Sequence, residues 1–221
     1  MLQQKITKTE QKVPMSFIEK LMKKMKYKEY KDNEGRIVIE TTKVKLVQVR
    51  QNNKEDKEKY INVLDFYLNK NRDILMVDEK DKDVVVDLEK VFEFETQHYN
   101  YNEFPMFFTY TTANTLLGVS GFRMHEKKSV NGKEYDLYEG SFKFSCVIED
   151  ELKEQKGLAA LVLFHYANIR QEYVFGDVFP GRKDFGFHLC DFVKDFKYVG
   201  KRKFVGFFEN TNCYYFDNLP S

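Results

Sequence analysis

The chain has 221 residues, of which 42% are hydrophobic and 16% aromatic, and its 36 basic and 35 acidic residues leave a net charge of +1. This amount of apolar side chain supports a packed core and excludes a wholly disordered chain. The balanced charge provides no general attraction to polyanions, so we expect no nucleic-acid partner.

The sequence predicts a cytoplasmic protein. No apolar run approaches the roughly 20 residues that a membrane helix needs, and the polar start MLQQKITKTEQK lacks a signal-peptide core. The cysteines Cys146, Cys190 and Cys213 are odd in number and far apart. This spacing argues against a disulfide framework and for a reducing compartment. Monomer and dimer both remain open.

An amphipathic helix is predicted directly after the polar tail. Ser16 and Glu19 have the spacing of a capping box. The apolar residues that share one face of this helix are Phe17, Ile18, Leu21, Met22 and Met25. Lysines crowd the rest of the helix, which leaves two interpretations open. Either the helix docks on the domain with its lysines in water, or it binds a membrane surface or an acidic partner.

We divide the chain into this tail and helix, residues 1–35, and a main domain, residues 36–221. Within the main domain, Asn53 is a plausible N-cap with Asp56 behind it, and residues 84–94 are ambiguous between strand and helix. The remaining predicted elements are strands over 36–50, 104–111, 116–127, 133–148 and 173–179, helices over 53–73 and from 157 to about 169, a short helix from Asp184, and one or two strands over 198–217.

A long hairpin forms the centre of the predicted fold. Asn131–Gly132 lies between two extended runs, and this dipeptide favours a tight hairpin turn because both residues tolerate positive φ. Gly140 within the second arm suggests a bulge. The strand–helix–strand piece over 142–179 fits a right-handed parallel crossover, whereas the strands before it pair antiparallel. The sequence therefore predicts a mixed α/β (α+β) sheet with helices on both faces, plus the extra N-terminal helix.

The polar loop before Gly157 is the main chemical candidate. A strand, a short loop and a helix that opens on a glycine would present unpaired N–H groups to a phosphate or pyrophosphate. Lys153 and Lys156 would add positive charge, and Ala159 would keep the first turn slim. The alternative is an ordinary strand–loop–helix corner with Gly157 there for packing.

Other chemistry is poorly supported by the sequence. The histidines His98, His125, His165 and His188 are scattered, so we expect no metal site. Cys190 is expected to be a buried cysteine. The aromatic residues of the last third suit a core better than base stacking.

Residues 40–219 resemble the GCN5-related N-acetyltransferases (GNAT), in particular the branch of the ribosomal-protein alanine acetyltransferases. Three pieces in the family's order carry this resemblance: Val44–Arg50 followed by Asn53-Lys-Glu-Asp56, Ser141–Ile148 followed by Glu154-Gln-Lys-Gly-Leu-Ala159, and Val174–Val178 followed by Phe192–Gly200. The resemblance implies a sheet in which one parallel pair of strands splays apart, and acetyl-CoA as cosubstrate.

The resemblance also implies how the cosubstrate is held. The backbone of Cys146, Val147 and Ile148 would pair with the pantetheine amides. The diphosphate would sit on the loop of Glu154, Gln155, Lys156, Gly157, Leu158 and Ala159. A primary amine of a protein or a small molecule would attack the thioester directly, with Glu139, Glu149 or His188 as base and Asp191, Tyr198 or Cys190 as acid.

The chain departs from the family pattern at several positions. Glu154 stands where the family usually has Arg or Gln, and Asp195 replaces a usual Gly. The family's frequent tyrosine acid falls at about Asp191, and a glutamate base used by some members falls near Phe144. Two functions are therefore compared: an acetyl-CoA-dependent N-acetyltransferase, and a protein of the same fold that has lost the chemistry and acts as a binding module.

Overall fold

The computed structural model describes residues 17–75, 85–97, 104–144, 152–170, 173–178, 183–193, 195–203 and 212–220. The helices are α1 (Phe17–Lys24), α2 (Lys54–Leu75), α3 (Leu88–Thr96), α4 (Lys153–Asn168) and α5 (Lys183–Phe192). The strands are β1 (Lys28–Lys31), β2 (Ile37–Glu40), β3 (Val44–Gln48), β4 (Met106–Thr111), β5 (Leu116–Val130), β6 (Lys133–Phe144), β7 (Tyr173–Val178), β8 (Lys197–Lys203) and β9 (Asn212–Asp217).

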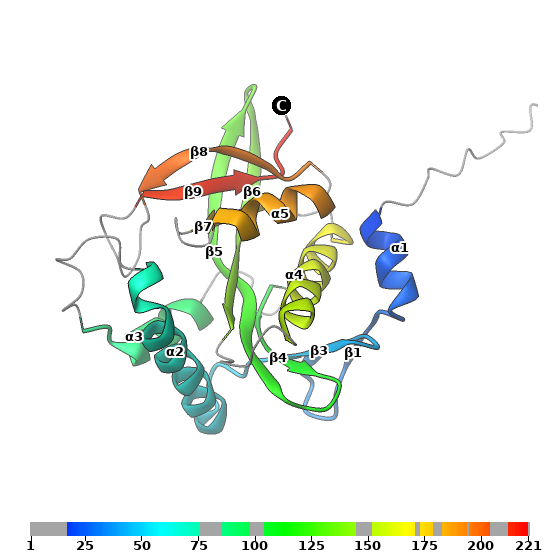
Figure 1. Cartoon of the computed structure of the whole chain (residues 1–221), viewed down its shortest axis with the longest axis vertical. Helices are drawn as coiled ribbons and strands as arrows, with labels where there is room; N and C mark the ends of the chain where they lie inside the picture. The colour runs from blue at the N-terminus through cyan, green and yellow to red at the C-terminus, as the bar shows by residue number, and fades with distance from the viewer. Residues whose placement is uncertain are drawn as a thin grey trace, which may run out of the picture.

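All described strands form a single sheet in the order β1-β2-β3-β4-β5-β6-β7-β9-β8 (Figure 1). Every neighbouring pair is antiparallel except β6–β7, which is parallel and is joined through α4. The predicted fold class, a mixed and mostly antiparallel sheet with one parallel pair, is confirmed.

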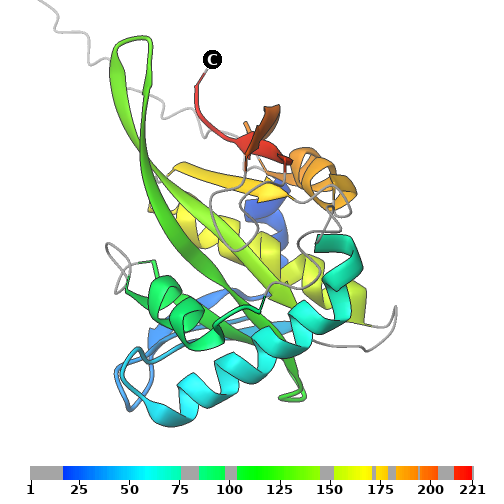
Figure 2. The same cartoon turned by 90° about the vertical axis from the view of Figure 1, so that its left-hand side faces the viewer.

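Helices cover both faces of the sheet, because each face carries its own apolar side chains. The face of α1, α4 and α5 holds the larger core, which includes Phe107, Val162 and Phe216. The face of α2 and α3 holds a second core around Tyr60 and Phe92. Figure 2 shows α2 and α3 in front of the sheet and α4 behind it.

Local turn chemistry places the long hairpin as predicted. Asn131 has φ 51° and Gly132 has φ 77°, and the pair joins β5 to β6. One other prediction is wrong, and one strand was not predicted. The expected strand over 36–50 is two strands, because Thr41 accepts hydrogen bonds from the amides of Lys43 and Val44 and closes a turn. The edge strand β1 was not predicted, since Lys28–Lys31 is exposed on both faces and shows no apolar alternation.

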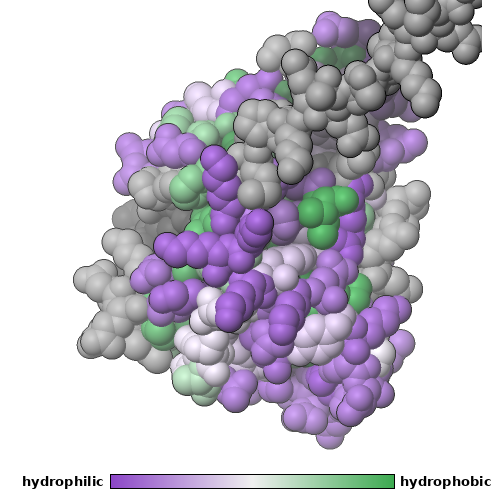
Figure 3. All heavy atoms as spheres, turned by 90° about the vertical axis from the view of Figure 1, so that its right-hand side faces the viewer, coloured by the Kyte–Doolittle hydropathy of each residue, from purple (hydrophilic) through white to green (hydrophobic). Residues whose placement is uncertain are grey.

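The apolar side of α1 is used within the fold. Ile18, Met22 and the following Met25 are buried in the same core as α4, whereas Phe17, expected on that side, is 55% exposed. Hydrophilic side chains dominate the molecular face that carries α1 (Figure 3). Ile18, Met22 and Met25 are thus unavailable to a membrane in this structure, while binding of an acidic partner by the lysines stays a prediction. The division of the chain at residue 35 also stays a prediction.

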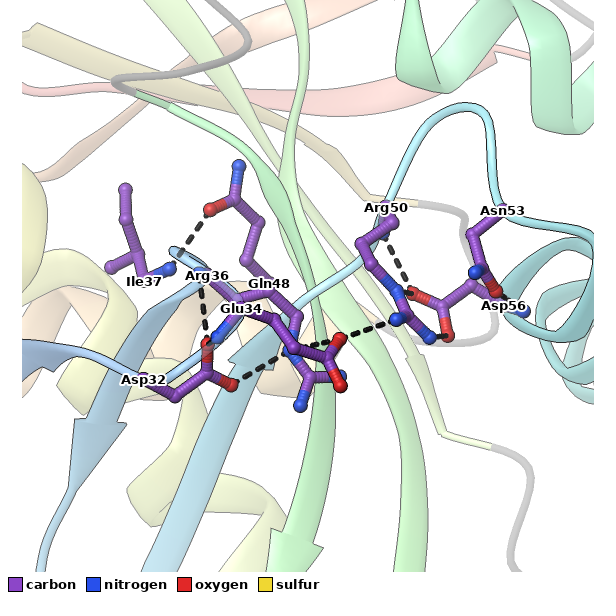
Figure 4. Close-up of polar contacts among 8 residues, drawn as sticks. All are labelled: Asp32, Glu34, Arg36, Ile37, Gln48, Arg50, Asn53 and Asp56. Atoms are coloured by element: carbon purple, nitrogen blue, oxygen red, sulfur yellow. Dashed lines mark hydrogen bonds and ion pairs between the residues drawn. The ribbon is translucent and has the colours of Figure 1, made fainter.

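The start of α2 is held by a network that also ties it to the β1–β2 turn (Figure 4). The predicted N-cap is confirmed: Asn53 Oδ1 accepts the amide of Asp56 at 3.0 Å. The buried Asp56 carboxylate accepts from Arg50 through its amide, Nε and Nη2 at 2.8, 3.0 and 2.9 Å. Arg50 also pairs with Glu34, and Arg36 pairs with Asp32 at 2.7 Å.

We expect Asp56→Ala to lower the free energy of unfolding by about 2 kcal/mol, because it removes a buried acceptor and leaves Arg50 partly unpaired. Burial raises the pKa of Asp56, but the hydrogen bonds and charge of Arg50 outweigh burial and lower it overall. The difference from wild type should therefore shrink below about pH 4, as the wild-type carboxylate is protonated. Urea unfolding at several pH values measures this. Asp65→Ala, at an exposed position of α2, is the control and should stay within about 0.5 kcal/mol of wild type.

Candidate functional site

Strands β6 and β7 diverge within the sheet. They pair only at Leu137–Tyr173, Tyr138–Val174 and Glu139–Phe175. Beyond this point β7 pairs on its other side with β9, and β6 continues to Phe144 paired with β5 alone. Within the described residues, the edge of Gly140–Phe144 that faces β7 therefore has no strand beside it. This is the divergence that the sequence resemblance implies.

A bulge lies where the strands separate. Phe122 pairs with Gly140 and Met124 with Glu139, so Arg123 is the extra residue on β5. The sequence suggested a bulge at Gly140 itself, and the structure places the extra residue on the neighbouring strand. A Cβ on Gly140 would lie 3.3 Å from the Phe142 ring and 3.9 Å from the Phe175 carbonyl oxygen. Bulges bend a strand and increase its twist, which suits a point where two strands diverge.

Helix α4 begins earlier than predicted. It starts at Lys153 with Leu152 as N-cap, and no side chain caps it. Only the first turn of a helix has amides without helical partners, which here means Leu152 to Gln155. The amides of Gly157 to Ala159 lie inside the helix, so the prediction that the helix opens on Gly157 is wrong. The physical reason is that Glu, Gln and Lys are good helix formers and extend the helix toward the N-terminus.

The predicted cofactor-binding residues divide into three groups. Cys146, Val147 and Ile148 lie outside the described residues. Glu154 is exposed in the first turn of α4. Partly exposed residues follow at Gln155, Lys156, Gly157 and Leu158, whereas Ala159 is fully buried. The phosphate-binding role of these residues stays a prediction.

Of the predicted proton-transfer groups that the structure describes, Glu139 and Asp191 lie on opposite faces of the sheet. Glu139 is buried, and its two oxygens accept from Arg123 Nε and Nη2 at 2.8 and 2.7 Å. Its strand neighbour Tyr138 packs on the side of α5, so Glu139 points to the opposite face. Asp191 is exposed in the last turn of α5. Glu149 lies outside the described residues, and of His188 only the helical backbone is described.

The two predicted acids on the C-terminal side have other contacts. Cys190 is partly exposed, so the expectation of a buried cysteine is wrong; its thiol donates to the Gly186 carbonyl at 3.5 Å, and partial burial raises its pKa. Tyr198 is 41% exposed on β8 and lies beside Phe187, with 5.4 Å between the ring centroids. Neither contact assigns either residue a role in proton transfer.

Sequence reasoning missed a buried cluster of charged and polar residues beside the parting strands. We call it the Glu95 cluster; its members are Tyr60, Glu95, Arg123, Glu139, Ser141 and Lys143. Lys143 Nζ donates to Glu95 Oε1 at 2.5 Å and to Ser141 Oγ at 2.7 Å. Tyr60 donates to the other oxygen of Glu95, and Arg123 Nη1 lies 3.6 Å from Glu95 Oε1.

A signal for this cluster was present in the sequence. Glu139, Ser141 and Lys143 alternate along one face of a predicted strand, opposite the apolar face of Phe142. Their partner Glu95 comes from a segment whose helical structure the sequence left ambiguous, so the ion pair itself could not be predicted.

Burial and charge shift the pKa values of this cluster. Burial raises the pKa of Glu95, but the charges of Lys143 and Arg123 outweigh it, and the pKa lies below the usual value. Burial lowers the pKa of Lys143 and Glu95 raises it, with a net lowering. The hydrogen-bond geometry fits an ionised carboxylate and a protonated amine at neutral pH.

The described part of the chain contains neither a metal-binding cluster nor a membrane-spanning helix. No group of three or more His, Cys, Asp or Glu residues there is placed to hold a metal ion. His165 lies on a mostly buried helix face, edge-on to Tyr27 at 4.9 Å between ring centroids, and burial lowers its pKa. None of the described helices combines the length and apolarity of a membrane span.

Comparison with known proteins supports the assignment of the fold but does not assign a function. No family model and no curated protein matches the sequence. Solved structures do match. RimL, named as the ribosomal L7/L12 alpha-N-protein acetyltransferase, has TM-score 0.51 and 12% identity, with 85% of this chain and 97% of RimL covered.

Two bacterial structures give the same result. A Chromobacterium violaceum protein assigned to the GNAT family has TM-score 0.50 and 12% identity, over 86% of this chain and 88% of its own. A Vibrio cholerae protein assigned as a ribosomal-protein-serine acetyltransferase has TM-score 0.50 and 13% identity, over 83% and 97%. The chain therefore has the GNAT fold, as the sequence resemblance indicated.

We expect Gly157→Ala to raise the free energy of unfolding by about 0.5–1 kcal/mol, because Gly157 lies inside a helix and alanine is the better helix former. A Cβ at this position meets nothing within 4 Å. Gly140→Ala, where the added methyl is crowded by Phe142, is the contrasting variant and should not stabilise the protein. Urea titration of the two variants measures the effect, and a loss of stability in Gly157→Ala would contradict the helical position.

Proposed function

We propose that this protein is an acetyl-CoA-dependent N-acetyltransferase that acts on a primary amine of a protein or a small molecule. The observation that carries the proposal is the divergence of β6 from β7 after Glu139 within a GNAT fold. Among the described residues, no strand lies beside the β7-facing edge of Gly140–Phe144, and main-chain donors and acceptors at such an edge need a partner. The two amides of a pantetheine arm supply such a partner in the manner of an added strand.

The start of α4 supports a place for the diphosphate. Unpaired amides at a helix N-terminus and the helix dipole favour an anion. Because the helix begins at Lys153, we assign the anion to the amides of Leu152 to Gln155 instead of those around Gly157. The backbone of Cys146, Val147 and Ile148 keeps its proposed contact with pantetheine, and we assign the edge of Gly140–Phe144 that faces β7 to the same contact.

The proposed reaction is a direct transfer. The neutral amine attacks the thioester carbonyl, a C–N bond forms, the C–S bond breaks, the nitrogen loses a proton and the thiolate gains one. The enzyme has to align the reactants and provide for the two proton movements. Glu139, Glu149 and His188 remain proposals for the base, and Asp191 for the acid. For Glu139 to accept a proton, its ion pair with Arg123 has to open.

A second candidate function is a GNAT-fold binding or interaction module that has lost the chemistry. The observation that favours it is Glu154, which is exposed in the first turn of α4. A carboxylate at that place repels a diphosphate by charge, and the same turn is where the anion would have to bind. Binding and turnover therefore have to be measured separately. A cytoplasmic location remains part of the proposal.

We expect acetyl-CoA at 100 times its dissociation constant to stabilise the protein by about 2.7 kcal/mol, since a ligand that binds only the folded state adds this free energy. Thermal unfolding with increasing acetyl-CoA measures it, with acetate as the control. Release of CoA thiol in the presence of peptide N-termini, polyamines or lysine-like amines measures transfer. Stabilisation without release for any amine would support the binding module, and no stabilisation at millimolar acetyl-CoA would overturn the acetyltransferase.

We expect Glu154→Lys to tighten acetyl-CoA binding by about three- to tenfold at low salt, because it replaces a repelling charge by an attracting one at the helix terminus. Asp184→Lys is the matched control: Asp184 is an exposed acid in the first turn of α5, and its replacement should leave the affinity unchanged. Titration calorimetry at two salt concentrations measures both variants. Equal effects of the two substitutions would show that α4 does not hold the diphosphate.

A further inference from the structure

The Glu95 cluster holds, from one face of the sheet, the part of β6 that lies beyond its ladder with β7. Lys143 and Ser141 belong to Gly140–Phe144, the part of β6 that has left β7, and Glu139 is the last residue of β6 paired with β7. Their partner Glu95 lies in the last turn of α3 and is completely buried. The link from Lys143 to Glu95 therefore joins the parted strand to the helix layer that covers it.

The opposite face fastens the same residues by apolar contacts. Phe142 stacks on Phe164 of α4, with 6.0 Å between ring centroids. The Gly140–Phe144 part of β6 is thus held by β5 at one edge, by α4 on one face and by the Glu95 cluster on the other. Only the edge toward β7 is left without a strand among the described residues.

A buried ionic cluster adds little to the stability of a protein compared with apolar residues in the same place. The carboxylates of Glu95 and Glu139 match the charges of Arg123 and Lys143, and all of these side chains are buried. Apolar residues of similar volume commonly stabilise a core as well or better, because charges lose their hydration on burial. Ionic hydrogen bonds, in contrast, define one direction and one distance. The cluster is suited to keeping Lys143, and with it the β6 backbone, in one position.

We infer that Glu95 is a positioning residue for acyl-CoA, which holds Gly140–Phe144 through Lys143 so that the β7-facing edge of this segment keeps one register with the pantetheine amides. This inference rests on the proposed function. If the link is broken, Gly140–Phe144 samples positions that do not match the ligand. The apparent dissociation constant rises in inverse proportion to the fraction of molecules that remain competent.

The test compares variants that differ in charge but keep the shape of the side chains. Glu95→Gln leaves Lys143 buried without its anion, and this variant alone can fail to fold. The double variant Glu95→Gln/Lys143→Met removes both charges and should fold as stably as wild type. We expect its dissociation constant for acetyl-CoA to rise about tenfold, as for a competent fraction reduced to a tenth. Lys143→Arg keeps the ion pair and should stay within about threefold of wild type.

The control removes an ion pair that also involves α3 but joins it to α2 and does not reach β6. Lys57 of α2 pairs with Glu89 of α3 at 2.8 Å, with Glu89 largely exposed. Lys57→Met/Glu89→Gln should leave the dissociation constant for acetyl-CoA unchanged. A tenfold loss of affinity in this control as well would mean that any loosening of α2 and α3 weakens binding, which would overturn a specific role for Glu95.

A readout without ligand separates this inference from the proposed function. Hydrogen exchange of the amides in residues 140–144 should be faster in the double variant than in wild type, because one face no longer holds the strand. If wild type does not bind acetyl-CoA but exchange still increases, the proposed function fails and the positioning of β6 by Glu95 stands. If the stable double variant shows wild-type exchange and wild-type affinity, the cluster has no positioning role and the inference is overturned.

Discussion

The structure depends on strand β6, whose ladder with β5 is much longer than its ladder with β7. Strand β6 pairs with β5 from Lys133 to Phe144 but with β7 only from Leu137 to Glu139. The proposed pantetheine contact follows from that difference, because beyond Glu139 the described part of the chain places no strand beside the β7-facing edge of β6. The bulge at Arg123 and the close packing at Gly140 lie at the same place, so bending of the hairpin and the end of the ladder occur together.

The two faces of the sheet stabilise β6 by different physical means. On the side of α4 the contacts are aromatic: Phe104 stacks on Tyr138 with 4.4 Å between centroids, and Phe142 stacks on Phe164. On the side of α3 they are ionic, through Lys143, Arg123 and Glu95. Aromatic contacts tolerate small sliding motions, whereas buried ionic contacts do so poorly. A strand held by both is stable and also precisely placed.

The start of α4 differs from what the family's sequence pattern implies for this chain. Its first turn consists of residues that favour helix, so the helix takes up residues expected in the loop and moves the unpaired amides to Leu152–Gln155. The change also places the Glu154 carboxylate among those amides. Affinity for a diphosphate thus depends on a balance between the main-chain donors, which attract it, and one side chain, which repels it.

The sequence alone determined the features that depend on neighbouring residues. Asn131–Gly132 specified the hairpin turn, Asn53 and Asp56 specified the start of α2, and the spacing of Ile18 and Met22 specified the buried side of α1. Each rests on local backbone preference or on the period of a helix, which a short stretch of sequence contains.

Only the tertiary structure decided the features that join distant segments. Strand β1 has no apolar pattern. It forms because its main chain pairs with the edge of β2. Lys143 and Glu95 are 48 positions apart, and their ion pair forms only after α3 has packed on the sheet. The residue at which β7 separates from β6 also depends on tertiary structure, because it depends on which strands lie beside β7. Main-chain hydrogen bonding is available to every residue, so the sequence contains no direct signal for this point.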